Sequence, residues 1–189
     1  MSKIYKVLGI AGSLRAKSFN RALIAYAAKT APASLAITPY DLAGLPMFDE
    51  DVEAKGYPDA VAKLQAAVGA ADALLIATPE YNYGTSGVLK NALDWMSRPP
   101  GKATCAGKPT ALIGAAAGGG GGSARAQLTL RPTLAAMGML QLVGADCAVP
   151  AAYAAFDANG DLVAEASQKA LAKTLDSFAA WIERLAPKA

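Results

Sequence analysis

Short apolar runs alternate along this chain with segments whose apolar residues recur at helical spacing. Strand-length runs cover residues 4–10, 35–40, 72–77 and 109–114, with a shorter one at 140–143. Helical spacing recurs over residues 19–27, 58–70, 88–96, 124–137 and 171–185. The run at 72–77 lacks polar alternation, which is typical of a strand covered on both faces. The repeated βα order predicts an α/β protein of one domain, 1–189, with a parallel sheet, helices on both faces and right-handed crossovers.

The connection after the third run, residues 78–87, contains a proline, two glycines, three hydroxyl residues and two tyrosines. It joins a buried strand to a helix. In open α/β sheets, ligands bind where strands end and helices begin. Two interpretations are open here. The loop is either the wall of a site for a flat ligand or an ordinary β-to-α connection.

The connection after the first run, residues 11–18, favours an anion site. Free N–H groups and the positive end of the helix dipole would point to one spot there. Ser13, Ser18 and Asn20 can donate hydrogen bonds, and Arg15 adds charge. The loop has neither common nucleotide fingerprint, so it suits a phosphate monoester better than a triphosphate. The alternative is that Ser18 only caps the helix while Arg15 is solvated.

A third connection, between the fourth run and its helix, holds five consecutive glycines, 118–122. Glycine lets the backbone approach a ligand closely and adopt positive φ without steric cost. The alternative is a floppy low-complexity insert. Because these three loops follow parallel strands, they would gather at one edge of the sheet.

The composition limits the kinds of catalysis that the chain's own side chains can perform. Hydrophobic residues make up 53% of the 189 residues and charged ones 17%, as in a well-buried globular chain. There is no histidine, which excludes histidine-based nucleophile systems and His-ligated metals. Cys105 and Cys147 match no metal spacing or disulfide framework. An enzyme built this way is expected to borrow its reactive atoms from a cofactor.

Other features bear on location and partners. The net charge of +3 is too small and scattered to indicate nucleic-acid binding. No apolar run reaches membrane-spanning length and no signal peptide is apparent, so we expect a cytoplasmic protein. The acidic residues 49–51 could form a metal site, but a solvated loop or helix N-terminal charge is the interpretation we favour.

Two long motifs carry a family resemblance. One is Gly12-Ser13-Leu14-Arg15 followed by Ser18-x-Asn20-Arg21, and the other runs from Pro79-Glu80-Tyr81-Asn82 through Gly87-x-Leu89-Lys90-Asn91 to Pro99. Residues 45–49 and 125–131 extend the match. The chain closely resembles the NADPH-dependent FMN reductase family, whose members include quinone and chromate reductases and azoreductase-like enzymes.

The resemblance implies a flavodoxin-like three-layer sandwich with a five-stranded parallel sheet of order 2-1-3-4-5. It implies hydride transfer from NADPH or NADH to N5 of FMN and then to a quinone, azo dye or chromate, with no catalytic protein residue and no metal. Family members form homodimers, often tetramers. The implied FMN contacts are Ser13, Arg15, Ser18 and Asn20 at the phosphate, Pro79, Glu80, Tyr81, Asn82, Tyr83 and Gly84 beside the isoalloxazine, and Ala116, Gly118 and Gly119 at its pyrimidine side.

Some positions depart from the family pattern. Gly84 and Ser86 stand where relatives usually have serine and proline, which predicts a more mobile second loop. Ala116 lacks the usual hydroxyl, the glycine run is slightly long, and Leu128 makes a tetramer less secure than a dimer.

Two matters stay open at this stage. Arg15, Lys17 and Arg98 are candidates to meet the 2′-phosphate of NADPH. The alternative function is a flavodoxin-type electron carrier or a non-catalytic flavin-binding protein, but electron carriers are typically acidic, and this chain is slightly basic.

Overall fold

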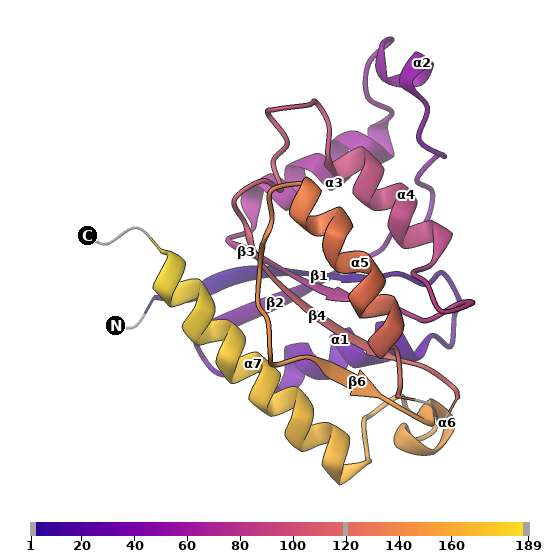
Figure 1. Ribbon diagram of the computed structural model, residues 1–189, viewed down its shortest axis with the longest axis vertical. Helices are drawn as coiled ribbons and strands as arrows, with labels where there is room; N and C mark the ends of the chain where they lie inside the picture. Colours follow the sequence, from indigo (N-terminus) through magenta and orange to yellow (C-terminus); the bar gives the residue numbers. More distant parts are fainter. Residues whose placement is uncertain (1–2, 119–120, 187–189) are drawn as a thin grey trace.

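The computed structural model describes residues 3–118 and 121–186, which form three layers around a parallel sheet (Figure 1). Neighbouring strands follow the order β2-β1-β3-β4-β5. The predicted strand order is therefore confirmed. The strands are β1 (Tyr5–Ala11), β2 (Leu35–Tyr40), β3 (Ala73–Ala77), β4 (Pro109–Ala115) and β5 (Leu140–Gln141).

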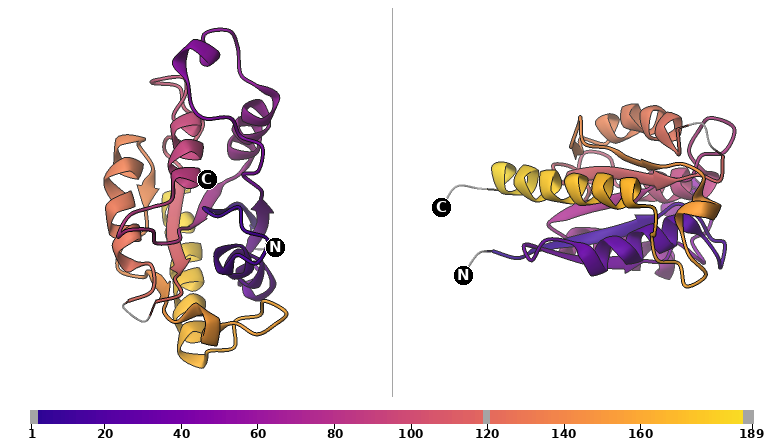
Figure 2. Two further views of the ribbon diagram at one scale, coloured as in Figure 1. Left: turned by 90° about the vertical axis from the view of Figure 1, so that its right-hand side faces the viewer. Right: turned by 90° about the horizontal axis from the view of Figure 1, so that it is seen from below.

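Helices cover both faces of the sheet, as predicted (Figures 1 and 2). One face packs on α1 (Phe19–Thr30) and α7 (Glu165–Leu185). The other packs on α3 (Asp59–Ala70), α4 (Gly87–Met96) and α5 (Ala124–Ala136). The central strand β3 is fully buried, which explains its apolar run without polar alternation.

The fifth position of the sheet differs from the prediction of one strand at 140–143. β5 ends at Gln141, and a further strand, β6 (Cys147–Val149), pairs with the other end of β4. Between them Gly144 has a φ of 80°, which an extended strand does not accommodate. The strand is thus split in two, and the sheet, predicted with five strands, has six in the described part of the chain.

Two short helices were also not predicted. Asp49 caps α2 (Glu50–Glu53) by accepting the Asp51 N–H, and Glu53 pairs with Arg98 at 2.6 Å. The acidic residues therefore begin a helix and bind an arginine. Within residues 3–118 and 121–186, no three His, Cys, Asp or Glu side chains are grouped as a metal ion requires. The other short helix, α6 (Ala152–Ala155), follows β6.

None of the helices in the described part of the chain is long and apolar enough to cross a membrane.

The end of β1 meets the start of α4 through a serine and a glycine. Ser86 caps α4 by accepting the Leu89 N–H at 3.1 Å, and its hydroxyl donates to the Gly12 carbonyl at 2.6 Å. A Cβ on Gly12 would lie 2.9 Å from the Leu89 Cβ and 3.1 Å from Pro79 Cδ. Glycine is therefore required for the first and second loops to touch.

We expect Ser86→Ala to lower the free energy of unfolding by about 1–3 kcal/mol, because it removes a helix cap and leaves a buried carbonyl without its donor. Urea denaturation of the apoprotein measures this. The matched control is Ser97→Ala at the other end of α4, where the half-buried hydroxyl donates to the Asp94 carbonyl. Equal losses in the two variants would contradict the role given to Ser86.

Candidate functional site

A pocket of about 270 Å³ lies where the loops after β1, β3 and β4 meet. We call it the edge pocket. Gly119 lies outside the described residues, and Asn82, Tyr83 and Gly84 are not part of the lining. The pocket brings together the remaining residues predicted from the sequence: Ser13, Arg15, Ser18, Asn20, Pro79, Glu80, Tyr81, Ala116 and Gly118.

The first loop presents donors at the start of α1. Ser18 is buried and accepts the Arg21 N–H at 3.3 Å, so the predicted helix cap is confirmed. The first N–H groups of a helix have no intrahelical acceptor. Within the described chain, those of Phe19 and Asn20 have no partner either. Together with the exposed Arg15 they form a site for an anion at the positive helix end.

Asn20 has a structural task that its sequence position did not indicate. It is 3% exposed, its Nδ2 donates to the Ala115 carbonyl, and its Oδ1 accepts the Ala115 N–H, both at 2.9 Å. Asn20 thereby ties α1 to the end of β4. One amide hydrogen is left over for a ligand.

The second loop is a closed two-residue hairpin. Tyr81 and Gly84 exchange both backbone hydrogen bonds, at 3.0 and 2.9 Å. The intervening Asn82 and Tyr83 have φ values of 49° and 65°. Such a turn needs positive φ at both positions, and tyrosine adopts it only with strain. Despite the missing proline, the loop therefore has a defined turn with two exposed rings.

An ion pair connects this hairpin to the helix after the third loop. Arg125 Nε donates to Glu80 Oε1 at 2.8 Å, and the guanidinium lies 4.0 Å from the Tyr83 ring centroid. Glu80 Oε2 also accepts the Ala126 N–H at 3.3 Å. Both oxygens of Glu80 thus hold the hairpin to the start of α5. Arg125 lines the pocket and was missed as a site residue, although it begins one of the segments of the family motif.

The third loop is fastened to β6 and the residues that follow it. Ala116 donates to the Val149 carbonyl and Ala151 donates to the Gly118 carbonyl, both at 3.1 Å. Gly122 has a φ of 63°, and a Cβ there would lie 2.8 Å from the Ala148 carbonyl carbon. The glycine run therefore starts and ends in hydrogen-bonded, close-packed backbone.

Burial removes the thiols from the available chemistry. It raises the pKa of Cys147 to about 12 and also raises the pKa of Cys105. Both thiols stay protonated at neutral pH, and the chain has no histidine. This agrees with the expectation that the reacting atoms come from a bound group. One end of the pocket offers hydroxyls, Arg15 and helix N–H groups, which suit a phosphate. The other end offers a tyrosine hairpin and glycine backbone, which suit a flat ring. FMN has both parts.

Comparison with known proteins agrees with this geometry. The family model for NADPH-dependent FMN reductase matches residues 5–154. The chain is 44% identical to an NAD(P)H-dependent FMN reductase of Pseudomonas aeruginosa over 98% of its own length and 99% of the relative's. It is 38% identical to a 2-hydroxy-1,4-benzoquinone reductase of Burkholderia, over 94% and 96% of the two chains.

A solved structure gives the same result. The flavoenzyme NAD(P)H:(acceptor) oxidoreductase FerB of Paracoccus denitrificans superimposes with a TM-score of 0.82 at 34% identity, covering 96% of this chain and 98% of that one. The chain belongs to the NADPH-dependent FMN reductase family, and it is an oxidoreductase whose cofactors are FMN and NAD(P)H.

Proposed function

We propose that this protein reduces quinones with electrons from NAD(P)H, using FMN held in the edge pocket. The meeting of an anion site, a tyrosine hairpin and a glycine loop in one pocket carries the proposal. Relatives named for quinone reduction support the acceptor class. Azo dyes and chromate are further acceptors that we expect the same site to reduce.

Bound FMN would supply a ring nitrogen that accepts hydride from NAD(P)H and the electrons that then reduce the acceptor. The protein's part is to bind and orient. Ser13, Arg15 and Ser18, with the N–H groups at the start of α1, would hold the phosphate. Pro79 to Tyr81 would form the wall beside the ring. The backbone of the third loop would supply fixed dipoles where negative charge develops.

The ring end of the pocket depends on the Arg125–Glu80 pair. Glu80 has a side chain only 8% exposed, whereas that of Arg125 is 51% exposed, so the cation lies at the solvent side of the pair. Because Arg125 also lies over Tyr83, it supports a hairpin whose backbone is strained. This arrangement favours one fixed position of the second loop before any ligand arrives.

The first test is the visible spectrum of the purified protein with FMN, recorded before and after anaerobic addition of NADPH, followed by addition of a quinone. We expect the flavin absorbance to bleach with NADPH and to return with the quinone. A flavin that stays oxidised with both NADPH and NADH would rule out the enzyme. Bleaching without re-oxidation by any quinone would rule out the acceptor class.

Arg15→Ala should weaken FMN binding by about 1–3 kcal/mol, the scale of a charged hydrogen bond. Quenching of FMN fluorescence during titration measures the affinity. Lys63→Ala, which removes one positive charge from the exposed surface of α3 on the opposite face of the sheet, is the matched control. Equal FMN affinity in Arg15→Ala and wild type would remove Arg15 from the site.

Arg125→Ala should weaken FMN binding by about 1 kcal/mol, since it removes a partly exposed ion pair and a cation–π contact. Arg125→Lys retains a charge opposite Glu80 but not the flat stacking on Tyr83, so an intermediate affinity is expected. The same fluorescence titration compares the variants. Wild-type affinity in Arg125→Ala would show that the hairpin does not need this support.

A further inference from the structure

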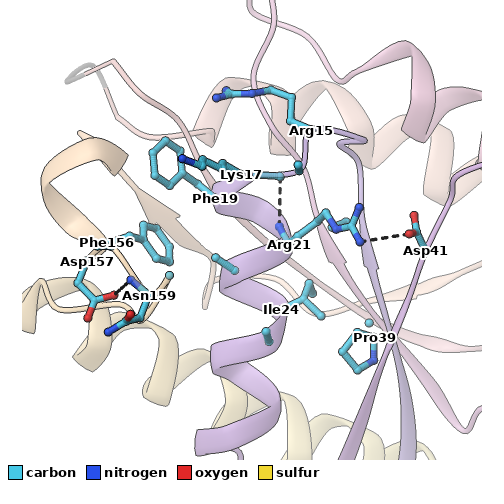
Figure 3. Close-up of a pocket in the computed structure, with 18 of the residues that line it drawn as sticks. Arg15, Lys17, Phe19, Arg21, Ile24, Pro39, Asp41, Phe156, Asp157 and Asn159 are labelled. Carbon is cyan, nitrogen blue, oxygen red and sulfur yellow. Dashed lines mark hydrogen bonds and ion pairs between the residues drawn. The ribbon is translucent and has the colours of Figure 1, made fainter.

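A groove of about 890 Å³ lies along the outer surface of α1 (Figure 3). We call it the α1 groove. Its lining includes Ala22 and Ala25 of α1, residues 39–41 on one side, and residues 153 and 156–160 on the other. Its volume lies within the range of small-molecule sites. Arg15, Ser18 and Phe19 line both this groove and the edge pocket, so the two are neighbours.

An aromatic cluster forms the side of the groove next to the edge pocket. The rings of Phe19 and Phe156 are stacked with centroids 5.5 Å apart, and Tyr153 meets Phe19 edge-on at 5.1 Å. Tyr153 nevertheless remains 70% exposed. A ring that contacts a neighbouring ring and is otherwise open to solvent is a platform on which a nucleobase can stack, because every base has a π-face.

The head of the groove is positively charged. Figure 3 places Arg15 and Lys17 there, at the start of α1. Within the part of the chain that the structure describes, neither has a carboxylate within ion-pair distance, whereas Arg21 pairs with Asp41 at 3.1 Å on the opposite side. The Asp157 carboxylate also lines the groove, but it accepts the N–H groups of two residues in its own turn. Lys17 is thus a free cation beside the aromatic platform.

We propose that the α1 groove binds the adenosine 2′-phosphate part of NADPH, with Tyr153 under the adenine and Lys17 at the 2′-phosphate. The proposal rests on the proposed function, since the nicotinamide of the same molecule has to reach the edge pocket. Because Arg15, Ser18 and Phe19 line both, a dinucleotide whose adenosine lies in the groove has its other end directed toward the FMN in the edge pocket. A basic side chain near the ribose is the usual means of accepting a 2′-phosphate.

The structure also removes one alternative cation. Arg98, a candidate from the sequence, donates to Glu53 at 2.6 Å and contacts the Phe48 ring. It is therefore bound to the segment around α2. Arg15 has a role already, at the FMN phosphate. Lys17 is left as the residue that distinguishes NADPH from NADH.

Binding of adenosine nucleotides to the FMN-loaded protein tests the groove without turnover. The probes are 2′,5′-ADP and 5′-AMP, which differ by the 2′-phosphate alone, and calorimetry measures both affinities. In the wild type we expect 2′,5′-ADP to bind about 3- to 10-fold more tightly, the scale of one solvent-exposed charged contact. Lys17→Ala should abolish this difference. Tyr153→Ala should weaken both ligands, and Lys63→Ala on α3 should change neither.

Steady-state kinetics then distinguish an effect on adenosine binding in the groove from an effect on the reduction of the flavin. The donors are NADPH, NADH and reduced nicotinamide mononucleotide, which has no adenosine. Lys17→Ala should lower kcat/KM for NADPH about 3- to 10-fold and leave NADH unchanged, whereas Tyr153→Ala should raise the KM for both dinucleotides. Neither variant should affect turnover of the mononucleotide.

The outcomes are distinguishable. Wild-type protein that turns over none of the three donors would overturn the proposed function, while the affinities for 2′,5′-ADP would still decide the groove. Equal binding of 2′,5′-ADP and 5′-AMP by the wild type, or an unchanged NADPH-to-NADH ratio in Lys17→Ala, would overturn the assignment of Lys17. Unchanged affinities in Tyr153→Ala would overturn the adenine site.

Discussion

The contact between Gly12 and Ser86 is the constraint on which the rest of the site depends. Two loops from separate strands can line one pocket only if their backbones approach closely, and the missing side chain of Gly12 permits this. One hydroxyl then serves both partners, since it caps α4 and donates to the carbonyl of the first loop. Helix stability and loop position are consequently linked through a single oxygen atom.

Each of the three loops is held by polar contacts with a neighbour, and the second also by the hydrogen bonds within its hairpin. The first is joined to the second through Ser86, the second to α5 through the Arg125–Glu80 pair, and the third to β6 through backbone hydrogen bonds. The strands that carry these loops are in turn packed in hydrophobic clusters on both faces of the sheet. With no histidine and with buried thiols, what these residues can offer a cofactor is shape, charge and orientation.

Much of the fold could be predicted because buried parallel strands read as continuous apolar runs, and Leu35–Tyr40 begins and ends as expected. The split of the fifth strand could not be predicted, because β6 has only three residues and follows a glycine with positive φ. The candidate site was found through loop positions and motifs. The tasks of Asn20 and Arg125 depend on partners 95 and 45 residues away, for which no local pattern gives a signal.

The side chain of Asn20 has a further consequence. By pairing with both the N–H and the C=O of Ala115, it imitates the edge of a neighbouring strand and locks the helix at the anion end to the strand that feeds the glycine loop. The distance between the start of α1 and the end of β4 is then set by the side-chain amide of Asn20. This pairing therefore sets how far the anion end of the pocket lies from the start of the glycine loop.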